Sequence, residues 1–183
     1  MFSEPIHDLP APLHQYVALT AVKWHQVGGH VSAKPVIRQP GESKEVMLRG
    51  HPMAFLVTGE DTKHTSMFDW TIPPGFATGL HVHRVQEETF YMLDGECEWH
   101  VGEDVVRAAP GVYLFIPPGV PHNITNVSDK PARVIMTVSP PGHERYFEEL
   151  AKLTEKGAPD PTAISDLRAR FDTDQLSALT TKA

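Results

Sequence analysis

Residues 75–95 read GFATGLHVHRVQEETFYMLDG, and residues 111–126 read GVYLFIPPGVPHNITN. The side chains in these stretches with metal-binding chemistry and regular spacing are those of His81, His83, Glu88 and His122. Side chains alternate between the two faces of a β-strand, so His81 and His83 point the same way, roughly 7 Å apart along the strand. Two imidazoles at that spacing can converge on one metal ion about 2 Å from each ring nitrogen. The two stretches therefore predict a metal site made of three histidines and one carboxylate.

Both stretches resemble the two cupin motifs. The positions that carry the resemblance are Gly75, His81, His83, Glu88 and Gly95 in the first motif, and Gly111, Pro117, Gly119, His122 and Asn126 in the second. Glu88 fits the spacing to the closing glycine better than Glu87 does. The resemblance implies an all-β, double-stranded β-helix (a jelly-roll barrel) that binds one metal ion through His81, His83, Glu88 and His122.

Length and composition narrow the class of protein. The chain has 183 residues, enough for one domain with appendages. Its net charge of −7 and scattered basic residues argue against a nucleic-acid surface. No apolar run approaches the roughly 18 residues of a membrane span, and the start of the chain does not read as a secretory signal. Because Cys97 is the sole cysteine, no internal disulfide can form, and we expect a cytoplasmic protein.

The pattern of residues divides the chain into three parts. Residues 1–45 form a proline-interrupted N-terminal arm, and residues 46–140 show the short β-rich runs and turns expected of a barrel. Residues 141–183 have helical periodicity and form a C-terminal helical extension. We expect the helices to cover the outside of the barrel, with a lid over its mouth as the alternative. Because exposed strand edges need cover, we also expect a homodimer.

Alternation along the strands predicts the pocket. If Glu88 points inward, so do Phe90 and Met92, whereas Tyr91 and Leu93 face outward. Trp99 also reads as inward. A pocket lined by Phe90, Met92 and Trp99 would favour a flat, apolar or aromatic substrate that is fixed chiefly by chelation. The remaining eight histidines lack a comparable spacing, and we interpret them as solvated or locally hydrogen-bonded.

The predicted ligand set limits the choice of metal. Three neutral imidazoles and one carboxylate leave two or three positions open on an octahedral first-row ion, which suits Fe, Mn, Ni or Co, with Zn possible. Open adjacent positions would admit a substrate oxygen and O2 together. Glu88, the single anionic ligand, could also accept a proton from an acidic substrate hydroxyl as a general base.

Beyond the motifs, the chain is similar to the small single-domain cupins grouped with the quercetin 2,3-dioxygenases. The supporting stretches are Gly59-Glu60-Asp61-Thr62, Glu88 to Glu96 and Pro140 to Leu150. In that family O2 opens a metal-bound flavonol with loss of carbon monoxide, and the ligand glutamate serves as base. The resemblance implies these roles for Glu88. This sequence departs from the family in two ways. Arg84 replaces the proline that many cupins have after the second histidine. The fungal enzymes carry two cupin domains, whereas this sequence shows one pair of motifs.

Three functions remain open from the sequence. The leading hypothesis is a metal-dependent dioxygenase, an oxidoreductase of the quercetinase-like type, that uses O2 on a small enolisable or phenolic, flavonol-like substrate. The second is a non-redox cupin, a cyclase, isomerase or lyase, whose metal acts as a Lewis acid. The third is a cupin that binds a small molecule without catalysis.

Overall fold

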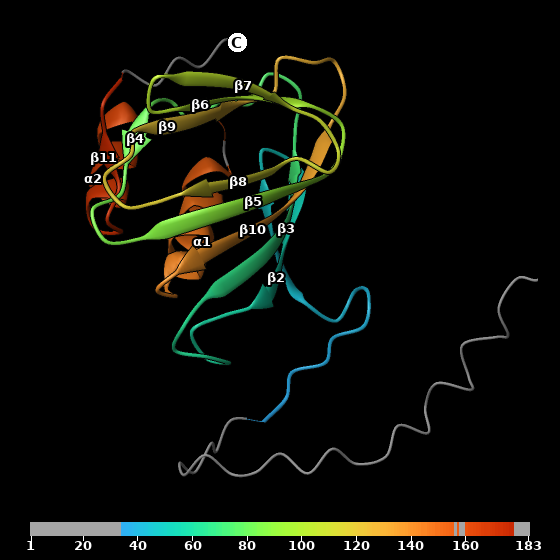
Figure 1. The fold of residues 1–183 in the computed structure, drawn as a ribbon. Coiled ribbons are helices and arrows are strands. Elements are labelled where there is room, and N and C mark those ends of the chain that lie inside the picture. The colour runs from blue at the N-terminus through green and yellow to red at the C-terminus, as the bar shows by residue number, and fades with distance from the viewer. Residues whose placement is uncertain (1–33, 156, 158–159, 178–183) are drawn as a thin grey trace, which may run out of the picture. The chain divides into compact units, whose positions relative to one another are not determined.

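The computed structural model describes residues 34–155, 157 and 160–177, and their strands form two antiparallel sheets (Figure 1). In the six-stranded sheet the order is β1 (Lys44–Leu48), β2 (His51–Val57), β3 (Ser66–Ile72), β10 (Ala132–Ser139), β5 (Glu87–Asp94) and β8 (Tyr113–Ile116). In the five-stranded sheet it is β11 (Asp174–Gln175), β4 (His81–Val82), β9 (His122–Thr125), β6 (Cys97–Val101) and β7 (Asp104–Ala108). This jelly roll confirms the predicted fold class.

Most of the predicted N-terminal arm lies outside the described residues. Within its described part, Arg38 donates to the main-chain oxygen of Leu56 (2.5 Å) and forms an ion pair with Asp61 (3.0 Å). Strand β1 begins two residues before the predicted start of the barrel. Residues 34–45 therefore contact the barrel that follows them.

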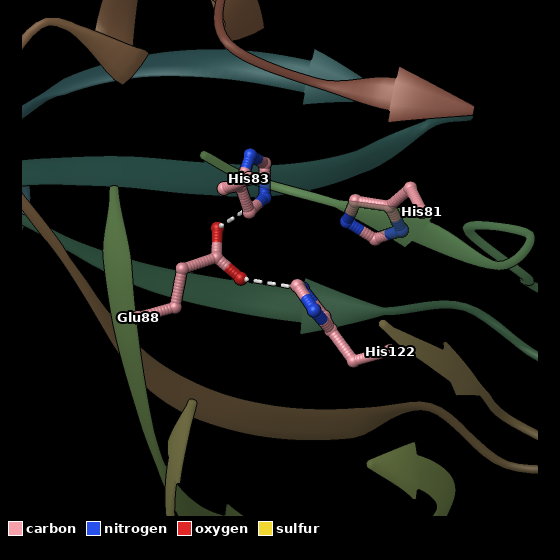
Figure 2. A group of neighbouring side chains, drawn as sticks. All are labelled: His81, His83, Glu88 and His122. Carbon is pink, nitrogen blue, oxygen red and sulfur yellow. Dashed lines mark hydrogen bonds and ion pairs between the residues drawn. The ribbon is translucent and has the colours of Figure 1, made fainter. Parts of the chain in front are cut away.

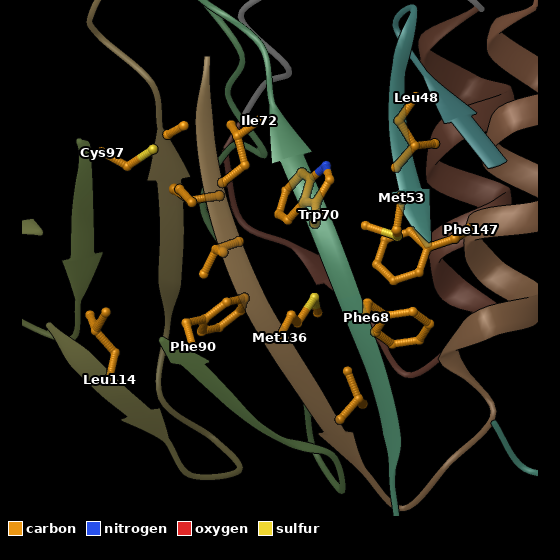
Figure 3. Packing of buried hydrophobic residues seen from close by; sticks show 14 of the residues in the cluster. Leu48, Met53, Phe68, Trp70, Ile72, Phe90, Cys97, Leu114, Met136 and Phe147 are labelled. Carbon is orange, nitrogen blue, oxygen red and sulfur yellow. The ribbon is translucent and has the colours of Figure 1, made fainter. Parts of the chain in front are cut away.

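The strands bury every second side chain. Along β3, Ser66, Phe68, Trp70 and Ile72 are buried, while the residues between them are half-buried. Strand β10 repeats the pattern: its even-numbered residues are buried, and its odd-numbered residues are exposed or half-buried. Side chains on a strand project to opposite faces in turn, so both strands present one apolar face to the interior (Figure 3).

Aromatic rings join the six-stranded sheet to the first helix. Phe68 packs edge-to-face against Phe55 of β2 and against Phe147, with ring centroids 5.2 and 5.1 Å apart. Phe147 belongs to α1 (His143–Thr154) and is 5% exposed. The contact, visible in Figure 3, therefore fixes α1 to the interior side of this sheet.

Gly95 makes the tight turn that joins the two sheets between β5 and β6. Its φ is 69°, in the left-handed region, where a side chain causes strain. A Cβ atom here would lie 2.7 Å from the Cα of Ala132 and 2.8 Å from the carbonyl oxygen of Pro131. Both conditions require glycine at the closing position of the first motif.

The chain after the barrel forms two helices and a short strand. Helix α2 (Pro161–Ala169) begins at Asp160, whose carboxylate accepts a hydrogen bond from the amide of Thr162 (2.9 Å), and proline occupies its first position. Beyond α2, β11 pairs with β4 in the order Asp174 to Val82 and Gln175 to His81. The chain after α2, predicted as part of a helical extension, thus adds a strand beside the first histidine motif. In the described part of the chain, no helix is both long and apolar enough to cross a membrane.

Candidate metal centre

The four predicted ligands come together from both sheets. His81 on β4 is paired directly with His122 on β9, and His83 follows β4. Glu88 reaches the same point from β5 in the other sheet (Figure 2). One ligand atom from each residue lies within 4.8 Å of the others, and all four residues are at most 8% exposed. Ligands about 2 Å from a shared ion are separated by distances in this range.

Main-chain carbonyls orient all three imidazole rings. Nδ1 of His81 lies 2.9 Å from the oxygen of Gly79, Nδ1 of His83 2.7 Å from that of Asp172, and Nδ1 of His122 2.9 Å from that of Val120. A carbonyl oxygen can only accept, so each Nδ1 carries the hydrogen. The Nε2 atoms are then left to bind a metal, the arrangement that metal-binding histidines usually have.

The atoms that face one another fit a cation. Nε2 of His122 lies 3.1 Å from Glu88 Oε2, and Nε2 of His83 lies 3.4 Å from Glu88 Oε1. Nε2 of His83 is buried and has no hydrogen-bond partner within the described residues. Neutral Nε2 and a carboxylate are both acceptors, so they approach this closely only with a proton or a metal ion between them. The cluster could therefore bind a metal ion.

The electrostatics of the cluster keep its ligands in suitable charge states. Burial lowers the pKa of His81 to about 3, with a further lowering from His122 nearby. Burial would raise the pKa of Glu88, but the imidazoles of His122 and His83 beside it hold it well below its ordinary value. For His83, burial lowers the pKa, yet the adjacent Glu88 carboxylate raises it overall. At neutral pH, His81 is thus neutral and Glu88 is ionised.

The segment after α2 holds the chain around His83. The carboxylate of Asp172 accepts hydrogen bonds from the amides of Arg84 (3.1 Å), Val85 (2.8 Å) and Gln86 (2.9 Å). Burial would raise the pKa of Asp172, but these three hydrogen bonds lower it. Asp172 has a φ of 54°, a left-handed conformation that aspartate tolerates better than most residues.

Arg84, the departure from the cupin motif, is part of the same arrangement. Its Nε donates to Asp174 of β11 (2.7 Å). The sequence carried no local sign of these contacts, because the partners are about 90 residues apart.

A cavity of about 70 Å³ adjoins the four ligands. Of the three predicted pocket residues, Phe90 and Trp99 line it, with ring centroids 4.3 Å apart. Met92 is fully buried but is not among the lining residues. It lies two positions further along β5, opposite Val134 of β10, and contributes to the core. As alternation predicts, Tyr91 and Leu93 face outward.

The C-terminal helices form part of the cavity wall, which corrects the expectation that they cover the outside of the barrel. The lining residues from this region are His143, Tyr146, Phe147, Leu150, Arg168 and Thr173. The alternative, a cover over the barrel mouth, describes their position better. Helical periodicity gave the apolar face of α1 but not the surface against which that face packs.

His143 was wrongly interpreted as a solvated or locally hydrogen-bonded residue. It is 3% exposed, and its ring lies against those of His83 (centroids 5.7 Å apart) and Tyr146 (4.7 Å). Burial lowers the pKa of His143 to about 4. The polar side chains of His143, Tyr146 and Arg168 also line the cavity, and no pattern in the sequence indicated them.

Comparisons with known proteins agree with the fold and the motifs. The cupin domain family model matches residues 68–138. The uncharacterized protein MJ1618 of Methanocaldococcus jannaschii is 31% identical over 80 residues, which are 43% of this chain and 64% of that protein. Tetracenomycin polyketide synthase protein TcmJ of Streptomyces glaucescens is 28% identical over 92 residues, 50% of this chain and 60% of that protein. The chain thus spans less than two thirds of the length of these curated relatives.

A solved structure shows the same fold. An RmlC-like cupin from Shewanella frigidimarina superimposes with a TM-score of 0.53 at 18% identity, covering 61% of this chain and 96% of that one. The segment that matches the cupin family model, residues 68–138, runs from β3 to β10 and contains all four residues of the cluster. With the two-sheet barrel and both motifs in place, this chain contains a cupin domain over residues 68–138.

Proposed function

We propose that this cupin is a metal-dependent dioxygenase of the quercetinase-like type, which uses O2 to cleave or oxidise a small enolisable or phenolic compound. In this proposal His81, His83, Glu88 and His122 bind one divalent first-row ion, which is Fe, Mn, Ni or Co, with Zn possible. The observation that carries the proposal is the set of three oriented Nε2 atoms and one carboxylate on the wall of a buried cavity.

The residues of the site have complementary roles in this reaction. When bound, the metal supplies Lewis acidity and, if redox-active, a path for electrons between the substrate and O2. Glu88 is ionised and lines the cavity, so it can accept the proton of a substrate hydroxyl. The rings of Phe90 and Trp99 exclude water from the same space and would position a flat substrate.

The size of the cavity favours a small substrate. Sites for drug-sized ligands usually have about 300–1,000 Å³, whereas this cavity has about 70 Å³. A flavonol would require α1 and α2 to move away from the barrel. We therefore propose a compact substrate, such as a small diketone or phenol, ahead of a flavonol.

Oxygen uptake provides the test. Protein purified without added metal is analysed for its elements and then placed in an oxygen electrode with small diketones, phenols and flavonols in turn. We expect O2 uptake equimolar with substrate loss, abolished by a chelator and restored by the metal that was found. Substrate loss without O2 uptake would contradict the dioxygenase and leave the second function.

The second candidate is a non-redox cupin, a cyclase, isomerase or lyase, in which the metal only polarises a carbonyl. The similarity to a polyketide synthase protein, TcmJ, favours this reading. A cupin that binds a small molecule without catalysis is the third candidate and would show tight binding without turnover.

We also propose a homodimer located in the cytoplasm. Tyr113 and Phe115 on β8, at the edge of the six-stranded sheet, are 59% and 47% exposed, and a second subunit would cover them. Cys97 is the sole cysteine and is buried, so no internal disulfide can form, which suits a reducing compartment.

A further inference from the structure

Arg168 is a buried cation in the wall of the cavity. It lies on α2 and is 7% exposed. Its Nη2 donates to the main-chain oxygen of Thr78 (2.8 Å), and its Nε donates to the hydroxyl of Tyr146 (3.3 Å). Its Nη1 is buried and has no hydrogen-bond partner among the residues that the structure describes. Two nitrogens of the guanidinium, Nε and Nη2, are thus held in place, while the N–H donors of Nη1 are unused.

The charge of Arg168 is also uncompensated. Within the described residues, it takes part in no ion pair. Arg170, two residues further along, differs in both respects, because its side chain is 59% exposed and pairs with Glu149 at 2.6 Å. A buried charge without a counter-ion is unfavourable, so an anion in the cavity would relieve that cost.

Two further polar atoms accompany this guanidinium. The hydroxyl oxygen of Tyr146 accepts from Arg168, which leaves the hydroxyl hydrogen available to a ligand. Nδ1 of His143 is buried and unpartnered within the described part of the chain. All three residues line the cavity, and all three come from the helical extension, whereas the candidate metal ligands come from the barrel.

We propose that Arg168, with Tyr146 and His143, forms an anion subsite that binds a carboxylate of the substrate, at a part of the substrate that the metal does not hold. This inference rests on the proposed function, and it narrows the substrate class to small enolisable compounds that carry a carboxylate. Arginine suits this role because its planar group can donate two parallel hydrogen bonds to a carboxylate, and such charged bonds are strong in a site without bulk water.

The test compares two probes that share one chelating group. They are 4,6-dioxoheptanoate, a 1,3-diketone whose carboxylate is separated from the chelating oxygens by two methylene groups, and its neutral methyl ester. Binding to the protein as purified, with its metal, is measured without O2 by isothermal titration calorimetry. We expect the acid to bind roughly 10- to 100-fold more tightly than the ester, the range for a charge-assisted hydrogen bond. In Arg168→Met this preference should disappear, whereas the matched control Arg170→Met should keep it.

Equal binding of the acid and the ester to the wild-type protein would overturn the assignment of a substrate carboxylate to this subsite, while the metal-centred function stands. A preference that persists in Arg168→Met would overturn it as well. Should Arg168→Met fail to fold, the acid and ester comparison in the wild-type protein decides.

A second measurement separates the subsite from the proposed function. Thermal unfolding is recorded with acetate and with neutral acetamide in the wild-type protein and both arginine variants. If neither diketone binds, the proposed function has failed, and a stabilisation by acetate alone that Arg168→Met abolishes and Arg170→Met retains would still support the subsite. If acetate stabilises but the acid and ester bind equally, the site takes a separate small anion, and the substrate assignment is wrong. No effect of acetate and no preference for the acid would overturn the inference entirely.

Discussion

Nδ1 of His83 donates to the main-chain carbonyl oxygen of Asp172, which lies 2.7 Å away and 89 residues further along the chain. The other two imidazoles are oriented by carbonyls two residues before them, those of Gly79 and Val120. One ligand of the candidate metal centre therefore depends on a segment outside the barrel, whereas the other two histidines depend on residues just before their own strands.

Asp172→Asn should weaken metal binding by roughly 10- to 100-fold, the usual effect of disturbing a group that positions a ligand. Asparagine tolerates the same left-handed backbone but cannot accept with both side-chain atoms, so the three amide hydrogen bonds to residues 84–86 would not all survive. Metal affinity is measured by competition with a chelator. Asp174→Asn is the matched control, since its pair with Arg84 is exposed and should matter little. Equal affinities in the two variants would contradict this role.

His81→Ala and His122→Ala should each lower the metal content of the purified protein sharply. Each removes one of four protein ligands from a buried site. Elemental analysis per mole of protein measures the effect. His100→Ala is a suitable control, because His100 lies on β6 with a side chain that is 43% exposed. Unchanged metal content in both ligand variants would place any metal elsewhere.

Glu88→Gln should separate metal binding from proton transfer. The amide keeps an oxygen near the same place and removes the negative charge, so part of the metal is retained while the base is lost. Activity per bound metal should fall about 100-fold or more, the scale of general-base catalysis. The measurement combines elemental analysis with O2 uptake. A variant that holds its metal and works at the parent rate would exclude Glu88 as the base and the quercetinase-like mechanism with it.

His143 should make the stability of the protein depend on pH. Its folded pKa is about 4, below the ordinary value of 6.5, so the unfolded state takes up a proton first as the pH falls. The folded state therefore loses stability from pH 6.5 towards pH 4. Between pH 7 and pH 5, this group should lower the free energy of unfolding by about 2 kcal/mol.

Urea unfolding at the two pH values measures this cost. His143→Phe should lose about that much less stability than the wild-type protein, while the exposed His64→Phe should keep the wild-type difference. A wild-type pH dependence in His143→Phe would show that another group is responsible.

The dimer can be tested by sedimentation equilibrium at micromolar concentration. One chain has a mass of 20.3 kDa, so twice that value is expected. The mass of a single chain would rule the dimer out.

The spacing of the residues, together with the resemblance to the cupin motifs, located the four residues of the cluster, because a jelly roll fixes which positions of paired strands lie side by side. His81 and His122 illustrate this, since their pairing follows from the two motifs. Alternation likewise gave the inward direction of Phe90 and Trp99. It could not separate a cavity wall from the core behind it, which is why Met92 was included.

The contributions of the C-terminal extension were beyond such reasoning. Whether His143 and Arg168 meet the cavity depends on where α1 and α2 pack, and this is decided by distant contacts such as Phe68 with Phe147. The two-residue strand β11 is too short to have a pattern of its own.

The carbonyl that orients His83 also sets an order of events during synthesis. A nascent chain that has emerged as far as Ser139 contains all four residues of the cluster and every strand of the six-stranded sheet. It still lacks Asp172, which fixes one of the imidazoles. We therefore expect the ribosome-bound barrel to fold before it can retain metal, with metal capture delayed until the C-terminal segment has been made and has paired with β4.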